Sequence, residues 1–314
     1  MPKNAVLCTV THSQILYSFA TFAFMKHRLT TWLPTGLPMA LALLAVTACD
    51  TSKSSADAAA SSSTVPTTAP AVSQRNALAA DAMEKNGIRL SPYGDSPKFA
   101  EAQMRLISPP SGSSVPSGNV RFTYQISNFE LTKMSGGPHM GEMANSAKGQ
   151  HIHNIVDNQP YSAHYETSFA KPMADGQHAV LSFLSRSYHE SLKQHGAYDL
   201  RLISVGNGPA PAVPLLDVTK PHMFYSRPKD TYSGADAKKI MLDFYLVNTT
   251  LTPSGNKVRA TINGTEFMLD KWMPYQMEGL PAGENTIKLE LVDGSGTLIP
   301  GAYNSVTRTF TVAP

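Results

Sequence analysis

The chain has 314 residues, with 26 Lys and Arg, 23 Asp and Glu and a formal net charge of +3 at pH 7. Three of the basic residues precede residue 49, so the rest of the chain has 23 basic and 23 acidic side chains. Nucleic-acid-binding proteins normally have a basic excess, with which they release counterions from phosphates. The balanced charge therefore excludes nucleic acid as an expected partner.

Residues 41–49 form a short apolar run that ends in small residues and a cysteine. This pattern resembles a bacterial lipobox, and residues 25–28 supply the positive start of a signal peptide. We therefore predict a signal peptide over 1–48, starting at Met25, and lipidation of Cys49 as the first mature residue. The lipid would tether the protein to an inner or outer membrane of the bacterial cell envelope. The alternative is a transmembrane anchor, but the apolar run is too short to span a bilayer.

Residues 49–103 are predicted to connect the lipid to the folded body. Residues 51–74 consist mainly of Ser, Ala, Thr and Pro without apolar periodicity, which is typical of a flexible tether. An alanine-rich stretch at 76–86 predicts one short helix. The cysteines, Cys8 and Cys49, both lie outside the folded body, so hydrophobic cores rather than disulfides must stabilise it.

The rest of the chain consists of two similar halves. Short β-rich segments alternate with Gly, Pro, Asn and Asp, and four of these segments recur in the same order. The matching segments are 120–132 with 240–252, 149–158 with 255–264, 176–180 with 283–287, and 198–205 with 306–312. This pattern predicts an all-β fold of two tandem immunoglobulin-like β-sandwiches, at residues 104–206 and 220–314. One continuous β-domain is the alternative.

The repeat also indicates which side chains face the core, because side chains alternate along a strand. Ile152 matches a core position of the second half, so the neighbouring His151 and His153 are expected on an outward, accessible face. Residues two apart on one face lie roughly 6.5–7 Å apart at Cα, close enough for both rings to reach one ion or anion.

The loop before these histidines is 14 residues longer than its counterpart in the second half. Binding residues concentrate on loops that a rigid scaffold holds. Imidazoles with thioether sulfur suit copper, and imidazoles alone can suit zinc. The predicted ligands for copper or zinc are His139, Met140, Met143, His151 and His153. Alternatively, these are ordinary surface, hydrogen-bonding and packing residues.

A second candidate site lies in residues 186–191, which combine a base, hydroxyls, an imidazole and a carboxylate on one turn. These groups suit a small anionic ligand or a partner protein of the envelope. The candidate ligand-binding residues are Tyr161, His164, Arg186, Tyr188, His189 and Glu190. A polar loop with a capping serine is the alternative.

Local enzyme motifs are missing from the sequence. It has no Gly-x-Ser-x-Gly elbow, no phosphate-binding glycine loop and no dinucleotide-binding fingerprint. His189 and Glu190 begin like a zinc-protease helix, but Lys193 stands where the second histidine is required. We therefore expect a non-enzymatic binding protein, with a copper or zinc protein and an envelope hydrolase as alternatives.

Four segments give the chain a resemblance to bacterial envelope lipoproteins of unknown function with duplicated β-sandwich domains. These segments are 148–153, 157–161, 184–191 and 224–228, and the resemblance spans most of 104–312. It implies an exported, lipid-anchored protein with two sandwiches, and some similar sequences have a phosphopeptide-binding label. The periplasmic copper-resistance β-sandwich proteins are a looser parallel, limited to the fold type and a loop with Met and His.

Overall fold

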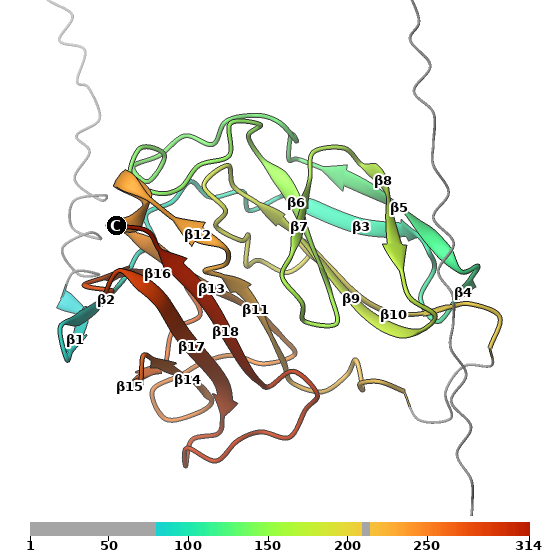
Figure 1. The fold of residues 1–314 in the computed structure, drawn as a ribbon. Coiled ribbons are helices and arrows are strands. Elements are labelled where there is room, and N and C mark those ends of the chain that lie inside the picture. The colour runs from blue at the N-terminus through green and yellow to red at the C-terminus, as the bar shows by residue number, and fades with distance from the viewer. Residues whose placement is uncertain (1–79, 209–213) are drawn as a thin grey trace, which may run out of the picture. The chain divides into compact units, whose positions relative to one another are not determined.

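The computed structural model of the protein describes residues 80–208 and 214–314. The predicted signal peptide, Cys49 and most of the predicted connecting segment lie outside the described residues. The described part is almost entirely β-structure, with a 3-10 turn at η1 (Gly234–Ala237) (Figure 1). Among these residues, no helix has the length and hydropathy that crossing a membrane requires.

The first sandwich consists of a three-stranded and a five-stranded sheet. The smaller sheet has the order β3 (Gln103–Ser108), β5 (Gly118–Ser127) and β8 (Ser168–Met173). The larger sheet has the order β4 (Ser114–Val115), β10 (Tyr198–Val205), β9 (Gly176–Ser185), β6 (His151–Val156) and β7 (Ser162–His164). Neighbouring strands pair antiparallel, except that β4 pairs parallel to β10.

The second sandwich consists of two five-stranded sheets. One has the order β1 (Met83–Lys85), β2 (Ile88–Pro92), β16 (Tyr275–Glu278), β13 (Ile240–Val247) and β11 (His222–Arg227). The other has the order β12 (Thr231–Tyr232), β18 (Ser305–Val312), β17 (Gly283–Val292), β14 (Lys257–Ile262) and β15 (Thr265–Leu269).

The two sandwiches share one topology. Strands β3 to β10 correspond in order to β11 to β18, and each sandwich joins its short parallel edge strand, β4 or β12, to the strand that closes the repeat. The turn after β5 also matches the turn after β13, since Asn128 and Asn248 have φ values of 56° and 55°. The predicted all-β fold of two immunoglobulin-like sandwiches is therefore confirmed.

Residues 83–92 form a β-hairpin, although the sequence indicated a short helix up to residue 86. Asn86 and Gly87 both have positive φ, 51° and 76°, as the two central residues of a type I′ hairpin turn require. Ile88 and Leu90 are buried while Arg89 is exposed, so β2 has the alternation of a strand. Because β2 pairs with β16, this hairpin extends a sheet of the second sandwich although it precedes the first sandwich in the chain.

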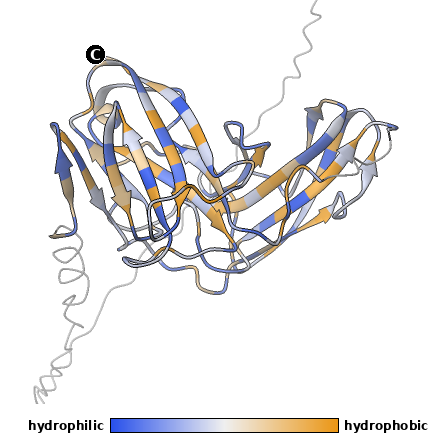
Figure 2. Ribbon diagram, turned by 90° about the horizontal axis from the view of Figure 1, so that it is seen from below, coloured by the Kyte–Doolittle hydropathy of each residue, from blue (hydrophilic) through white to orange (hydrophobic). Residues whose placement is uncertain are grey.

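Each sandwich has its own apolar core, and a third apolar layer joins the two. In this layer Phe183 of β9 stacks on Tyr245 of β13, with ring centroids 4.7 Å apart, and Phe224 of β11 packs beside them. Hydrophilic and hydrophobic residues alternate along the strands (Figure 2). Full burial of a phenylalanine side chain stabilises a fold by about 1.5–3 kcal/mol, so this layer holds the sandwiches against each other.

Candidate functional site

His151 and His153 point away from the core of the first sandwich, as the alternation along β6 predicts. Ile152 between them packs into that core, whereas Ile155 lies in the apolar layer shared with the second sandwich. The two imidazoles are not accessible, however, because both residues are 0 % exposed. The prediction of an accessible face was wrong because other side chains cover this face of β6. Tyr161 stacks on His153, and the rings of Tyr165 and His189 pack against His151.

His189 joins these two residues in a cluster of three imidazoles, called the trihistidine cluster below. The Nε2 atom of His151 lies 2.9 Å from Nε2 of His153 and 3.1 Å from Nδ1 of His189. One ring nitrogen from each residue can be chosen so that all three lie within 4.8 Å of one another. The sequence placed His151 and His153 in one candidate site and His189 in the other, and the structure brings them together.

His189 reaches the cluster from a strained turn between β9 and β10. Its φ is 67°, in the left-handed region that costs a residue with a Cβ about 1 kcal/mol or more. The turn is held by two backbone hydrogen bonds of 2.9 Å, from His189 N–H to the Arg186 carbonyl and from Arg186 N–H to the Glu190 carbonyl. A strained backbone that directs an imidazole into a polar cluster is typical of a functional position.

Hydrogen bonds define which ring nitrogens of the cluster can act as ligands. Nδ1 of His151 lies 2.8 Å from the Gly149 carbonyl, so Nδ1 carries the proton and Nε2 directs its lone pair into the cluster. Nδ1 of His153 is buried and has no hydrogen-bond partner. The one free lone pair of His151 can accept a hydrogen bond from only one of the two neighbouring rings, His153 or His189. The trihistidine cluster therefore forms fewer hydrogen bonds than its ring nitrogens require.

Gly149 fixes the carbonyl that orients His151, and no other residue fits its place. Its φ is 82°, and a Cβ there would lie 2.3 Å from the Thr132 carbonyl oxygen. The backbone around Gly149 is held by a hydrogen bond of 2.8 Å from Thr132 N–H to the Gln150 carbonyl. The two ends of the long loop therefore meet at Gly149 and hold the carbonyl that orients the imidazole of His151.

Burial keeps the three imidazoles neutral. It lowers the pKa of His151 to about 4, with the Gly149 hydrogen bond opposing the shift. Burial also lowers the pKa values of His153 and His189 well below the usual range, and the positive charges of Arg227 and Lys229 add to the effect. Neutral imidazole is the form that binds metal ions.

Tyr161 forms one wall of the trihistidine cluster. Its ring stacks on His153 with centroids 3.6 Å apart and an interplanar angle of 12°. Its hydroxyl oxygen lies 3.4 Å from Nδ1 of His189, and the Lys229 ammonium lies 4.6 Å from its ring centroid. Burial raises the pKa of Tyr161, so the phenol is neutral beside the cluster.

The other three predicted metal ligands lie elsewhere. His139 places Nε2 2.5 Å from an Asp95 carboxylate oxygen. Met140 is 44 % exposed, and Met143 is buried against Tyr93 in a small apolar cluster. The long loop therefore supplies no thioether to His151 and His153, and the predicted site is replaced by the trihistidine cluster.

Two of the predicted anion-binding residues also have other surroundings. His164 lies on β7, where it stacks on Phe169 with centroids 3.3 Å apart and places Nε2 2.8 Å from the Ser162 hydroxyl. Tyr188 is fully buried in the same small apolar cluster as Met143. Neither residue contacts the trihistidine cluster through a hydrogen bond or ring contact recorded in the described part of the chain.

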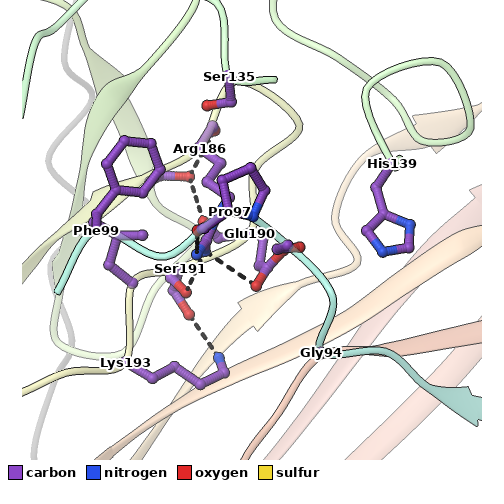
Figure 3. A network of polar contacts seen from close by, with 12 residues as sticks. Gly94, Pro97, Phe99, Ser135, His139, Arg186, Glu190, Ser191 and Lys193 are labelled. Carbon is purple, nitrogen blue, oxygen red and sulfur yellow. Dashed lines mark hydrogen bonds and ion pairs between the residues drawn. The ribbon is translucent and has the colours of Figure 1, made fainter. Parts of the chain in front are cut away.

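Arg186 and Glu190 do lie together, in a polar network at the turn between β9 and β10 (Figure 3). Nη1 of Arg186 donates to Glu190 over 3.0 Å, and Nη2 donates to the Pro97 carbonyl over 2.6 Å. Glu190 also accepts a hydrogen bond from Ser96. Burial raises the pKa of Glu190, against the opposing charge of Arg186. In this view His139 stands apart on its own loop.

Comparisons with known proteins give similarities of fold type only. No family model matches the chain, and no curated protein matches it. Among solved structures, fibronectin(III)-like modules of Clostridium thermocellum CbhA match 67% of this chain and 94% of theirs at 10% identity and a TM-score of 0.23. The central fibronectin-III array of RIM-binding protein matches 70% of this chain and 69% of its own at 11% identity and a TM-score of 0.22. The FN1–FN3 domains of chicken CNTN1 match 71% of both chains at 11% identity and a TM-score of 0.20.

Proposed function

We propose that the protein is a non-enzymatic binding protein of the bacterial cell envelope, lipid-anchored through Cys49, and that its ligand is a transition metal ion held by the trihistidine cluster. The observation that carries this proposal is the convergence of His151, His153 and His189 on one point. The lipid anchor and the envelope location rest on the sequence pattern at residues 41–49.

Two of the three nitrogen separations in the cluster match those around a metal ion, and the third pair lies within 4.8 Å. Two nitrogens held about 2.05 Å from a metal at an angle of about 90–100° are about 2.9–3.1 Å apart. The observed separations from His151 Nε2 are 2.9 Å to His153 and 3.1 Å to His189. An ion would accept all three lone pairs, which the hydrogen bonds among the rings cannot satisfy. The carbonyl of Gly149 then acts as the outer partner that orients a ligand.

Copper is favoured over zinc at this site. The donors are three neutral imidazoles, and no Asp, Glu or Cys belongs to the group. Lys229 lies against Tyr161, which itself stacks on His153, so a positive charge is close. Monovalent copper has half the charge of the zinc ion and is therefore repelled less, and imidazole suits copper as well as zinc.

Binding is favoured over catalysis by the burial of the cluster. His151 and His153 are 0 % exposed, and Tyr161 is 5 % exposed. A substrate larger than a small ion would have to displace the wall formed by Tyr161. The hydrolase alternative therefore receives no support from this geometry.

A metal competition experiment tests the proposal. The full chain, purified in detergent, is titrated with Cu(I) in competition with a chromogenic Cu(I) chelator, and with Zn(II) in a parallel series. We expect one copper ion per chain, tighter binding of copper than of zinc, and loss of uptake in His153→Ala. His195→Ala is the matched control, since His195 is an exposed histidine outside the cluster. Equal uptake by both variants would contradict the proposed site.

A further inference from the structure

A cavity of about 430 Å³ lies beside the polar network, and the trihistidine cluster does not account for it. Three segments that are distant in the chain line it, at residues 93–100, 186–194 and 272–274. The turn that carries His189 into the cluster thus presents Arg186 and Glu190 to this cavity. Ligand sites typically have volumes of about 300–1,000 Å³ and form where separate segments or domains meet.

One side of the cavity is apolar and firmly held. Tyr93, Phe99 and Trp272 contribute aromatic surface, and Met273 and Pro274 extend it. The indole N–H of Trp272 donates to the Phe244 carbonyl over 3.0 Å. This side is therefore preorganised for an apolar group, which reduces the entropy that a ligand must lose on binding.

The charged part of the lining adjoins this aromatic surface, since Arg186 lies 5.6 Å from the ring centroid of Phe99 and Lys193 lies 5.6 Å from that of Trp272. One positive charge in this part has no counterion. Lys193 is paired with Asp243 at 2.5 Å, and Arg186 is paired with Glu190 at 3.0 Å. Lys98 is exposed and donates only to the Gly94 carbonyl, over 3.2 Å, and it forms no ion pair with residues 80–208 or 214–314. The charges around the cavity therefore leave an excess of one positive charge.

Arg186 lines the same cavity and has an unused donor. The residue is 5 % exposed, and its Nε atom is buried without a hydrogen-bond partner. A buried donor without a partner is unfavourable, so a shift of this side chain that brings its N–H to a ligand oxygen would remove a penalty that the free protein carries. A guanidinium N–H and an ammonium group together form a suitable site for a carboxylate.

We propose that this cavity binds an amphiphilic monocarboxylate, with its apolar body against Phe99 and Trp272 and its carboxylate between Lys98 and Arg186. The single negative charge matches the excess positive charge, and the apolar body matches the aromatic side. This site is distinct from the trihistidine cluster, and its occupancy does not require a metal ion.

Trp272 provides the signal for the test. The chain has two tryptophans, and Trp32 lies in the predicted signal peptide, so Trp272 is the only indole of the protein that begins at Cys49. This protein is titrated with 4-phenylbutyrate, with 4-phenylbutan-1-ol as the uncharged analogue and with acetate as the headgroup alone. Tryptophan fluorescence and calorimetry follow binding in the presence of a metal chelator.

We expect saturable binding of 4-phenylbutyrate at about millimolar concentration or tighter, about tenfold weaker binding of the alcohol, and no response to acetate. Lys98→Gln should weaken binding of the carboxylate about fivefold, whereas Lys238→Gln, at an exposed lysine away from the cavity, should change it less than twofold. Circular dichroism verifies that both variants are folded. The proposal is overturned if 4-phenylbutyrate does not saturate, if the alcohol binds equally well, or if Lys98→Gln binds like the parent.

Discussion

His189→Asn separates the binding role of His189 from a structural role. The backbone φ of 67° costs a histidine about 1 kcal/mol or more, and asparagine tolerates this left-handed conformation better. The variant also loses two polar contacts, of 3.1 Å to His151 and 3.4 Å to Tyr161. Together these contacts stabilise the buried site by about 1 kcal/mol. We therefore expect the free energy of unfolding of the metal-free protein to stay constant or to rise by up to about 1 kcal/mol.

The same variant should lose its affinity for copper. Removal of a group that only orients a ligand typically costs 10–100-fold in metal affinity, so removal of a ligand should cost at least about 100-fold. Urea unfolding in the presence of a chelator measures the stability, and competition with a Cu(I) chelator measures the affinity. A fall of more than about 2 kcal/mol in the metal-free protein, with copper affinity unchanged, would show that His189 contributes to packing and does not bind the metal.

Three further predictions concern the surroundings of the cluster. In metal-free protein the free energy of unfolding should fall as the pH decreases from about 6.5 to about 4, because folding lowers the pKa values of His151 and His164 to about 4. At these two side chains the unfolded chain takes up protons in this range and the folded chain does not. Urea unfolding at each pH checks this, and a flat profile would contradict it. Gly149→Ala should destabilise the protein by about 2 kcal/mol or more and weaken copper binding, because its Cβ would lie 2.3 Å from the Thr132 carbonyl oxygen. Thermal unfolding measures the stability and the competition assay measures the copper affinity. Values like those of the parent protein would rule out the close contact. Phe183→Ala should lower the free energy of unfolding by about 3–5 kcal/mol, since this side chain is fully buried between the sandwiches. A decrease below about 1 kcal/mol in urea unfolding would mean that the apolar layer contributes little to stability.

The duplicated β-sandwich fold could be predicted because its evidence is local. Alternation and turn residues recur in both halves, and the positions of Asn128 and Asn248 after equivalent strands agree with the matched motif. The hairpin at 83–92 could have been recognised as well, because Asn86-Gly87 is a strong signal for a type I′ turn. It was missed because the alanine-rich stretch before it favours a helix.

The trihistidine cluster could be predicted only in part. Alternation along one strand places His151 and His153 on the same face, and that part of the prediction agrees with the structure. Their burial depends on the packing of other segments against that face, and His189 lies 38 residues beyond His151 in the chain. No periodicity links residues at such a distance. A histidine within a tight, polar turn was the only local signal, and it suggested an anion site instead.

X-ray absorption spectroscopy at the copper edge, on copper-loaded full chain, identifies the atoms that bind the metal. We expect three nitrogen ligands at about 2.0 Å with the multiple-scattering pattern of imidazole. His195→Ala should leave this spectrum unchanged, and His153→Ala should abolish it. A copper site that contains sulfur, as Met140 or Met143 would provide, or a spectrum that persists in His153→Ala, would contradict copper binding by the trihistidine cluster.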